Sequence, residues 1–398
     1  MGFLNRKKSW QFGEQARKLP VVTDASKWLQ THKDDTEVSI KTGSRNSALC
    51  TRRHPSKTLP ETLEAILANP ESHFVKSRRD WDILKYSRLY TGEAYSLPAT
   101  FEFALKNCWL HVPSGMVISS SKEILAFSTY ALNAFYQGHS EVDWNESPWI
   151  EEPAFKLATV WGRNYAHWLM DALPKADALV SNDPRLIILD KNAPRFQEES
   201  TTLLKIPNRL IPQNSLLRFR ELHFVSSTKS GMPDPSPLHR IRKRLQKSIG
   251  IENPKPSRRI YISRQKTRRK IINEGQIRPV LEKFGFEEIF PEEMNFSEQV
   301  KTFSEAEAIF GVHGAGTMNV LFAQPETALI EAFNPRVWDH AAHRVASLGG
   351  VRHYHFFGKD SGQAYDISLD PSTLERILLL AFDDSATSPD PLLVEKIF

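Results

Sequence analysis

The most regular pattern of apolar and polar positions in the chain lies in residues 308–333. An apolar run at 308–312 predicts a buried strand, the His-Gly-Ala-Gly sequence at 313–316 a tight turn, residues 317–323 a helix, and residues 328–333 the next strand. The turn of such a crossover lies at the carboxyl end of a parallel strand, where open α/β sheets bind ligands. Its glycines allow close approach to the backbone, and the helix start offers N–H groups. The pattern indicates either an anion site, such as one for phosphate, or a tight turn without a ligand.

Similar alternation continues on both sides of a proline-rich segment at residues 229–257. Residues 101–134 predict a small antiparallel β-meander, and strands then alternate with helices from 156 to 226 and again from 259 to 357. This order predicts two parallel sheets with crossover helices. The expected strands are 156–161, 186–189, 222–226, 259–263, 286–290 and 351–357, and the expected helices are 165–180, 196–204, 239–250, 276–284, 298–306, 339–347 and 372–382.

These elements predict five parts of the chain. Residues 1–100 form an N-terminal extension, and residues 101–235 form the β-meander with a first Rossmann-like domain. Residues 236–257 are a linker, and residues 258–365 are a second Rossmann-like domain. Residues 366–398 form a helix and a tail, which could pack back on the first domain.

Composition adds limits on class and location. Of 398 residues, 40% are hydrophobic and 25% charged, as in soluble globular proteins, and the net charge of +5 is too weak to indicate nucleic-acid binding. The chain has no apolar run long enough for a membrane span, and its basic N-terminus lacks the apolar stretch of a signal peptide. Cys50 and Cys108 have neither metal spacing nor a disulfide framework, which fits a reducing cytosol.

Two further stretches could have a functional role but also have a simpler explanation. Residues 2–19 are amphipathic and basic, so they would allow peripheral membrane contact, although a solvated terminus is the commoner case. Residues 80–82 spell Asp-Trp-Asp, a pattern that many metal-dependent glycosyltransferases use to hold a divalent ion. Without a strand end before it, we interpret this match as a surface coincidence.

The first candidate site lies in the helix predicted after the strand at 156–161. His167 and Asp171 are four residues apart and share a face with Asn164, opposite the apolar stripe of the helix. Such a pair is either an ordinary surface contact or a general base held by a carboxylate.

The second and third candidates belong to the later sheet. Seven of the thirteen residues at 258–270 are basic, and Arg264 stands at a strand end, where its two parallel donors could grip a diphosphate. A nucleic-acid patch competes with this interpretation, but aromatic residues are not interleaved beyond Tyr261. Glu331, at the end of the strand 328–333, could accept hydrogen bonds from ribose hydroxyls or simply face solvent.

Together these stretches resemble glycosyltransferase family 61, whose bacterial members include capsular polysaccharide biosynthesis proteins. The resemblance covers about residues 100–360. It rests on the order and spacing of N-x-x-H-W-L-x-D-x-L-P at 164–174, I-S-R…R-R-x-I-x-N-E at 262–274, G-F-x-x-x-x-P-E at 285–292, the segment 296–300, and G-x-H-G-A-G-x-x-N-x-x-F at 311–322.

The resemblance implies an α/β fold of GT-B type, with two Rossmann-like domains facing a cleft and, here, a β-rich N-terminal extension. It implies inverting sugar transfer from a nucleotide sugar, UDP being the expected nucleotide, with no obligatory metal or other cofactor. Catalysis would fall to His167 and Asp171, with either as the base, and Asn164 and Trp168 would line the cleft. The donor would be bound by Arg264, Arg268, Asn273, Glu274, His313, Gly314, Ala315, Gly316, Asn319 and Glu331.

We therefore expect a bacterial cytoplasmic glycosyltransferase, with possible peripheral contact at the inner membrane, that acts in capsule or other surface polysaccharide synthesis. Its partners would be a nucleotide sugar and a glycan or lipid-linked glycan acceptor, and not nucleic acid. The alternative is a non-catalytic protein of the same fold that binds nucleotide sugars or glycans.

Overall fold

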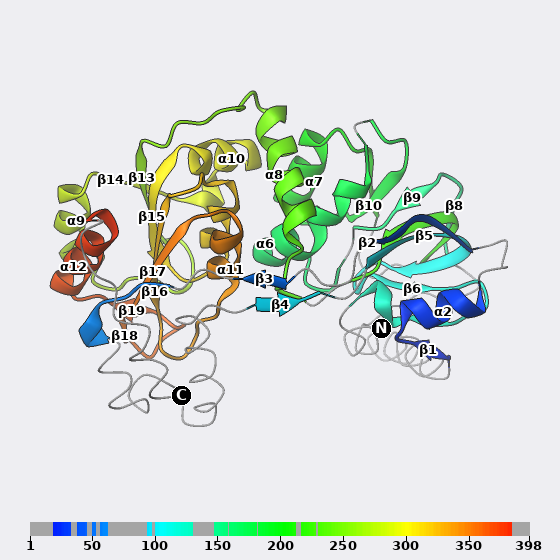
Figure 1. Cartoon of the computed structure of the whole chain (residues 1–398), viewed down its shortest axis with the longest axis horizontal. Coiled ribbons are helices and arrows are strands. Elements are labelled where there is room, and N and C mark those ends of the chain that lie inside the picture. Colours follow the sequence, from blue (N-terminus) through cyan, green and yellow to red (C-terminus); the bar gives the residue numbers. More distant parts are fainter. Residues whose placement is uncertain are drawn as a thin grey trace, which may run out of the picture. The chain divides into compact units, whose positions relative to one another are not determined.

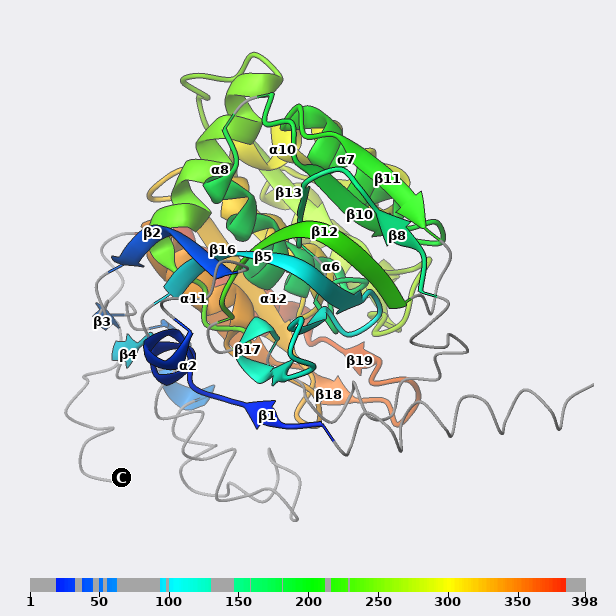
Figure 2. The same cartoon turned by 90° about the vertical axis from the view of Figure 1, so that its right-hand side faces the viewer.

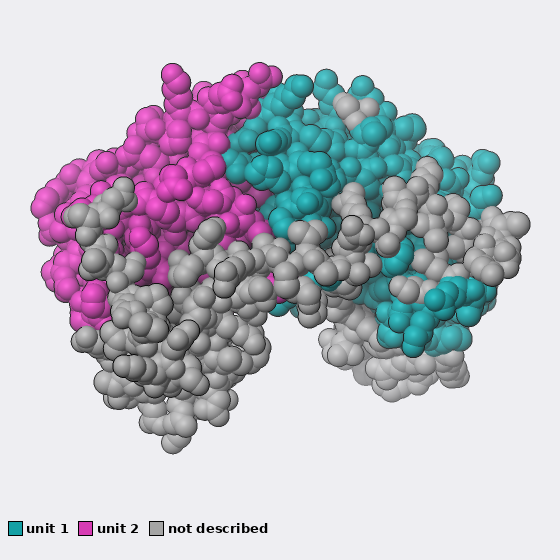
Figure 3. Space-filling model, in the orientation of Figure 1, with its two compact units in different colours: residues 1–49, 96–248 teal, residues 50–95, 249–398 magenta. Residues whose placement is uncertain are grey.

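The computed structural model divides into two compact units. The first comprises residues 1–49 and 96–248, and the second comprises residues 50–95 and 249–398 (Figure 3). Each combines helices with a sheet that contains parallel strands, so the predicted mixed α/β class is confirmed. The structure describes residues 19–32, 38–45, 50–52, 56–62, 94–97, 100–129, 147–157, 159–180, 182–211, 216–227 and 230–383.

The stretch that would allow membrane contact and the Asp-Trp-Asp match lie almost entirely outside the described residues. The sequence at 80–82 and all but the last residue of the amphipathic stretch at 2–19 lie outside them. Among the helices that the structure describes, none is both long and apolar enough to cross a membrane.

One mixed sheet of ten strands forms the first unit. The strands are β1 (Val21–Val22), β2 (Val38–Arg45), β5 (Thr100–His111), β6 (Met116–Ile118), β7 (Ile124–Leu125), β8 (Trp149–Ile150), β9 (Ala154–Phe155), β10 (Leu186–Asp190), β11 (Asn208–Ile211) and β12 (Leu216–Val225). Their order is β1-β7-β6-β5-β12-β9-β10-β11, with β2 also paired to β5 and β8 to β12 (Figures 1 and 2). The helices are α2 (Ala25–Thr31), η3 (Ala126–Ser128), α6 (Tyr165–His167), η5 (Trp168–Ala172), η6 (Leu173–Ala178), α7 (Arg195–Leu203) and α8 (Pro235–Ser248).

The predicted β-meander belongs to this same sheet and is not a separate piece. Strand β5 runs antiparallel to β12, with Phe103 opposite Phe224 and their rings stacked 5.0 Å apart in the core. On its other side β12 is parallel to β9, which is parallel to β10. The carboxyl ends of these three strands therefore meet at one edge of the sheet, where ligands bind in α/β folds.

The described part of the N-terminal region also joins the first unit. Strand β2 pairs with β5, and the indole of Trp28 from α2 packs in the core near Phe103 and Phe127. Helix α8, which the sequence assigns to the linker, packs on η6, where Arg240 binds Asp177 at 2.7 Å. The N-terminal extension and the linker are thus partly built into a compact unit.

The helix predicted at 165–180 is divided into three short pieces. A single α-helical turn, α6, passes into the π-helical turn η5 and then into the 3-10 helix η6. Pro174 explains the division, because it has no N–H for the carbonyl one turn earlier. The helix ends at Ala178, and Val180, the last residue of the predicted helix, is 70% exposed.

The strand predicted at 156–161 is shorter and lies earlier. Strand β9 ends at Phe155, and the chain then turns, with the Gly162 N–H donating to Thr159 and the Asn164 N–H donating to Trp161. The Lys156 side chain is buried and donates to the carbonyl of Ser128 at 2.7 Å. The turn between β9 and α6 thus occupies residues expected in the sheet.

Five parallel strands form the sheet of the second unit. They are β13 (Arg258–Ile262), β14 (Phe286–Ile289), β15 (Ala306–Val312), β16 (Ala328–Phe333) and β17 (Arg352–Phe357). The helices are α9 (Glu274–Lys283), η7 (Pro291–Glu293), α10 (Phe296–Ser304), η8 (Ala315–Phe322), α11 (Ala341–Leu348) and α12 (Pro371–Phe382), and two small two-stranded sheets pair β3 (Cys50–Arg52) with β4 (Ala94–Ser96) and β18 (Lys359–Asp360) with β19 (Ile367–Ser368).

The strand order β14-β13-β15-β16-β17 makes this sheet doubly wound. Helices α9 and α12 pack together on one face, and α10, η8 and α11 cover the other (Figure 1). Along β15, Ala308, Phe310 and Val312 point into the core beneath α9 and α12, as the apolar run predicts. The direction of winding reverses between β13 and β15, and such a switch point is where doubly wound sheets bind ligands.

Two segments that are distant in the sequence, residues 56–59 and helix α12, complete the second unit. Residues 56–59 lie along the edge strand β17, where the Lys57 N–H donates to His353 and the His355 N–H donates to Lys57, both at 2.9 Å. Helix α12 packs on α9, β16 and β17, where the sequence suggests a return to the first domain. The apolar face of α12 explains this, because Leu374, Ile377 and Leu378 are fully buried in the core of the second unit.

Candidate functional site

His167 and Asp171 form a close pair in the first unit. His167 Nδ1 donates to Asp171 Oδ2 at 2.7 Å, and Asp171 also accepts from Ser230 Oγ and the Gly231 N–H, each at 3.0 Å. The carboxylate is almost fully buried, whereas the imidazole is 30% exposed. Because Nδ1 is held by the carboxylate, Nε2, which no described residue contacts by a hydrogen bond, is the nitrogen that can take a proton.

The two neighbouring residues predicted to line the cleft have structural roles. Asn164 caps α6, since its Oδ1 accepts from the Ala166 N–H at 2.9 Å. Trp168 is 1% exposed and its indole donates to Ser200 Oγ at 3.0 Å. The prediction that Trp168 lines a cleft is therefore wrong, because the π-helical turn directs its large ring into the core.

A hollow of about 440 Å³, including the solvent space at its mouth, lies beside Asp171 at the carboxyl end of β12. Charged groups of both signs line it (Asp171, Lys175 and Asp234), together with apolar residues such as Met170 and Val225. Burial lowers the pKa of Lys175 to about 8, although Asp171 opposes this effect. The mixture of hydrogen-bonding groups and apolar surface is typical of small-molecule sites.

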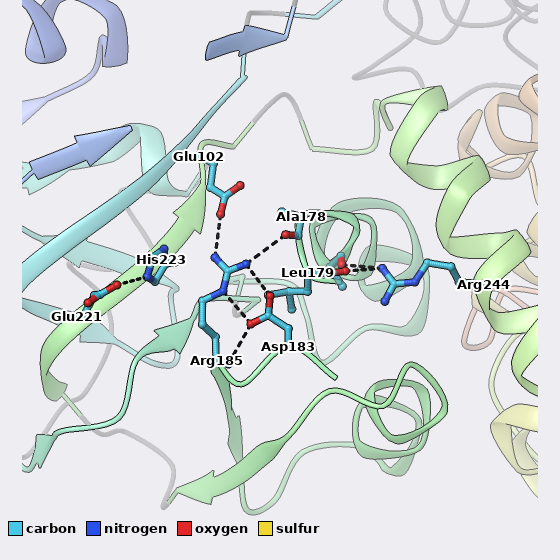
Figure 4. A network of polar contacts seen from close by, with 9 residues as sticks. Glu102, Ala178, Leu179, Asp183, Arg185, Glu221, His223 and Arg244 are labelled. Carbon is cyan, nitrogen blue, oxygen red and sulfur yellow. Dashed lines mark hydrogen bonds and ion pairs between the residues drawn. The ribbon is translucent and has the colours of Figure 1, made fainter. Parts of the chain in front are cut away.

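A buried arginine fixes the end of the helix that lines this hollow. Arg185 donates to Glu102 at 2.8 Å, to both oxygens of Asp183, and to the carbonyl of Ala178 at 3.2 Å (Figure 4). Arg244 of α8 donates to the carbonyl of Leu179 at 2.8 Å. These contacts satisfy the last carbonyls of η6, which a short helix leaves without partners.

In the second unit, Arg264 lies against the glycine loop at the switch point. A Cβ built on Gly314 would lie 2.6 Å from Arg264 Nη1, so the guanidinium rests directly on the loop backbone. Burial lowers the pKa of Arg264 to about 10, and the nearby charges of Arg269 and Arg268 act in the same direction. The glycine is therefore needed for contact with an arginine of the protein itself, besides any contact with a ligand.

Positive groups gather around this contact. Arg264 Nε donates to the carbonyl of Arg268 at 2.9 Å, and Arg269, in a left-handed conformation with φ of 64°, donates to the carbonyl of His313 at 3.2 Å. Within the described part of the chain, none of the three arginines forms an ion pair with a carboxylate, and the N–H groups of Ala315 and Gly316 have no acceptor. The loop is thus electrostatically suited to an anion.

Three other cations of the basic segment are neutralised. Arg258 pairs with Glu287 and Glu305, Arg259 with Glu307, and Lys266 with Glu293. Among the described residues, the cations of this segment without an ion pair to a carboxylate are therefore the three arginines at the loop and Lys270.

Glu331 lies inside β16, two residues before its end, and is completely buried. Its Oε1 accepts from Thr317 Oγ1 at 2.8 Å and from His313 Nδ1 at 3.3 Å, and its Oε2 accepts from His353 Nε2 at 3.0 Å. Although burial opposes the shift, the bonds from His313 and His353 lower the pKa of Glu331 to about 2. The sequence-based interpretation of a carboxylate facing solvent or ribose at the strand end does not describe this buried position.

His313 is held in its charged form between two carboxylates. Its Nε2 lies 3.5 Å from Asp339 Oδ2, while Nδ1 faces Glu331. Burial would lower its pKa, but Asp339 and Glu331 outweigh burial and raise the pKa of His313 to about 9. The first residue of the glycine loop is therefore a cation at neutral pH.

Of the remaining predicted donor residues, Asn319 contacts the loop, whereas Asn273 and Glu274 bond to other segments of the second unit. Asn319 is fully buried and donates to Gln299 at 2.9 Å and to the carbonyl of Gly316 at 3.2 Å. Asn273 exchanges two hydrogen bonds with the backbone of Leu369. Glu274 pairs with Arg278 at 2.8 Å, and burial raises the pKa of Glu274.

The sequence analysis does not single out several residues that the structure brings to these places. They come from separate segments: Ser230 beside Asp171, Arg269 and Thr317 at the loop, and Asp339 and His353 beyond it. Arg269 belongs to the basic segment and Thr317 follows the glycines, so the sequence carried a signal for both. Ser230 lies at the start of the proline-rich segment 229–257 and belongs to no recognisable motif.

Residues 165–330 match the family model described as Glycosyltransferase 61. In this region the chain is similar to glycosyltransferase family 61. This confirms the resemblance and supports glycosyltransferase activity as the class of reaction. The glycosyltransferase 61 match begins at the first residue of α6 and includes the His167–Asp171 pair, Arg264 and the glycine loop. No curated protein matches the chain.

Metal ligands are a separate question. Among the residues that the structure describes, no group of three or more His, Cys, Asp or Glu side chains is arranged to hold a metal ion.

Proposed function

We propose that this protein is an inverting glycosyltransferase that moves a sugar from a nucleotide-sugar donor to a glycan or glycoconjugate acceptor. One observation carries the proposal: inside the matched family region, Arg264 lies against Gly314 at the switch point of a doubly wound sheet. This is the position at which such sheets bind nucleotides and phosphates.

The glycine loop is the proposed site of the donor diphosphate. Arg264, Arg268 and the charged His313 supply positive charge, and the N–H groups of Ala315 and Gly316 supply donors. These groups would stabilise the negative charge that develops on the departing nucleoside diphosphate, in the role that a metal ion has in other enzymes. Metal-independent transfer and UDP as the nucleotide are therefore parts of the proposal.

The His167–Asp171 pair is the proposed base. An acceptor hydroxyl oxygen forms a bond to the anomeric carbon as the bond from that carbon to the diphosphate breaks. The leaving nucleoside diphosphate takes the electron pair, and the hydroxyl proton passes to His167 Nε2. Asp171 fixes the ring through Nδ1 at 2.7 Å and stabilises the imidazolium that forms. Attack from the face opposite the leaving group inverts the anomeric configuration.

The hollow beside Asp171 is the proposed place of the acceptor. Its carboxylates and the Lys175 amine can exchange hydrogen bonds with hydroxyl groups, while Met170 and Val225 can contact the C–H face of a sugar ring. We further propose a GT-B arrangement of the two units, a bacterial cytoplasmic setting with peripheral membrane contact, and a role in capsule or other surface polysaccharide synthesis.

A thermal-shift screen with UDP, GDP, CMP, ADP and dTDP, each with and without magnesium, tests the donor site. A ligand at 100 times its Kd stabilises a protein by about 2.7 kcal/mol, which raises the Tm by a few degrees. We expect one nucleotide to stand out without magnesium, and the shift to disappear in Arg264→Ala. Absence of any shift would contradict the donor site.

A transfer assay then separates the enzyme from a non-catalytic binding protein. The purified protein is incubated with the sugar forms of the selected nucleotide and a panel of glycan acceptors, and release of nucleoside diphosphate is measured. Release that depends on both acceptor and His167 supports transfer. Binding of the nucleotide sugar without release under any acceptor condition would favour the non-catalytic alternative.

A further inference from the structure

A series of buried polar side chains links Glu331 through His353 to Ser56, which is far from both in the sequence. His353 Nε2 lies 3.0 Å from Glu331 Oε2, and His353 Nδ1 lies 2.6 Å from Ser56 Oγ. The same hydroxyl oxygen is 2.7 Å from His355 Nδ1. Ser56, His353 and His355 are 2%, 3% and 0% exposed, so water cannot replace these partners.

The carboxylate of Glu331 fixes the direction of the first bond in this series. Because His313 and His353 hold the pKa of Glu331 at about 2, the carboxylate only accepts, so His353 Nε2 carries a hydrogen toward it. The Ser56 hydroxyl lies between two ring nitrogens and can donate to one while it accepts from the other. Burial holds the pKa of His355 well below its usual value.

The position of Ser56 is fixed by the backbone. The next residue, Lys57, makes two backbone hydrogen bonds with β17, one on each side of Tyr354. The Ser56 hydroxyl is thereby held between the rings of His353 and His355, which extend from the same face of β17. Ser56 and His353 both lie outside the residues matched by the family model.

We propose that Ser56 and His353 are positioning residues for the glycine loop. They fix one oxygen of Glu331 so that the other holds His313 at the head of the loop, with its second nitrogen toward Asp339. The inference rests on the proposed function for the identity of the anion, a nucleoside diphosphate, but its effect on His313 does not depend on that identity.

Other charged groups that face His313 are not changed in the proposed variants. Asp339 contacts its Nε2, Arg269 donates to its carbonyl, and Arg344 of α11 acts on Asp339. Because these groups are untouched by changes at Ser56 or His353, a shift in the titration of His313 would report the orientation of Glu331.

The experiment follows the ring of His313 by NMR in protein with carbon-13-labelled histidine, with the resonance assigned through His313→Asn. His353→Leu removes the donor to Glu331, and His353→Gln keeps a side-chain N–H. Ser56→Ala removes one hydroxyl, and Ser304→Ala is its matched control, a buried serine of α10 that donates to the carbonyl of Val300 at 2.7 Å.

We expect His353→Leu and Ser56→Ala to lower the titration midpoint of His313 by about one pH unit, the size of effect that a neighbouring carboxylate exerts. His353→Gln and Ser304→Ala should leave the midpoint in place. The affinity for UDP, or for pyrophosphate as the simplest probe, should decline as the pH rises through the midpoint of His313. In His353→Leu and Ser56→Ala this decline should therefore begin about one pH unit lower than in the wild-type protein.

An unchanged midpoint in both His353→Leu and Ser56→Ala would overturn the proposal. If His353→Leu fails to fold, Ser56→Ala decides alone, since it removes a single oxygen. If the wild-type protein binds no nucleoside diphosphate, the proposed function fails, whereas the midpoint of His313 still decides the role of Ser56 and His353.

Discussion

The guanidinium of Arg264 fills the space in which a side chain on Gly314 would stand: a Cβ there would lie 2.6 Å from Nη1. Arg264 follows β13 and Gly314 follows β15, so the contact joins the two loops on either side of the switch point. A glycine in such a loop usually suggests close approach of a ligand, but here it also makes room for the side chain of Arg264.

Gly314→Ala should therefore separate binding from folding. The atom that must move is the end of a flexible side chain, so we expect the Tm to change by only a few degrees. The displaced guanidinium should weaken nucleoside diphosphate binding about tenfold, since one charge-assisted contact is worth roughly 1.5–3 kcal/mol. Calorimetric titration checks this. Gly275→Ala is the control, because nothing lies within 4 Å of its added Cβ, and equal losses in both variants would contradict the explanation.

Arg264→Ala should slow transfer more strongly than Arg264→Lys. A bidentate contact to the developing diphosphate charge is worth about 2–4 kcal/mol of transition-state stabilisation, or a 30- to 1000-fold change in kcat/KM. Lysine keeps the charge but not the two parallel donors, so it should restore only part of the rate. Steady-state kinetics of the three proteins measure this, and identical rates would remove Arg264 from the donor site.

Asp171→Asn should reduce kcat by about 10²- to 10⁴-fold with little change in donor affinity. The amide oxygen would keep the bond from the Gly231 N–H at 3.0 Å, so the NH2 group would face His167 Nδ1 in place of the oxygen that now lies 2.7 Å away. Because NH2 cannot accept from Nδ1–H, the ring would lose its tautomer and its orientation. Asp177→Asn is the matched control, since Asp177 pairs with Arg240 away from His167. If the rate of Asp171→Asn stays near that of the control, the base lies elsewhere.

Alkaline pH should weaken both stability and anion binding. The pKa of His313 is raised from 6.5 to about 9 in the folded protein, so its contribution to stability is complete below pH 6.5 and is lost as the pH rises through 9. Urea unfolding between pH 6 and 10 should show this decline, and His313→Asn should flatten it. An equally steep decline in His313→Asn would assign the effect to another group.

Strong local patterns in the sequence predicted their elements well. The apolar run before the glycine loop predicts nearly the whole of β15, and the strand after the loop has the expected bounds of Ala328–Phe333. These segments have one face or both faces in the core and end at glycine or proline, so burial and turn chemistry agree. The start of α10 was less clear: the sequence predicts a helix from residue 298, whereas α10 begins at Phe296 and is capped by Asn295, which forms a capping box with Glu298.

Pairing between strands that are far apart in the sequence could not be predicted in the same way. Strand β12 finds β5 across more than a hundred residues of chain, and β9 is only two residues long. The site divides in the same way. His167, Arg264 and the loop residues stand in recognisable motifs, whereas Asp339 and His353 reach His313 and Glu331 only through the fold.

Ser56 and His353 meet across 297 residues of sequence, and this distance has a consequence for biosynthesis. At about 5–20 residues per second, the ribosome completes β17 roughly 15–60 s after Ser56 has been made. During that interval Ser56 and Lys57 do not have the strand with which they later pair, and that strand is completed only with the histidines they cover. The second unit can therefore close this part of its interior only after β17 has been made.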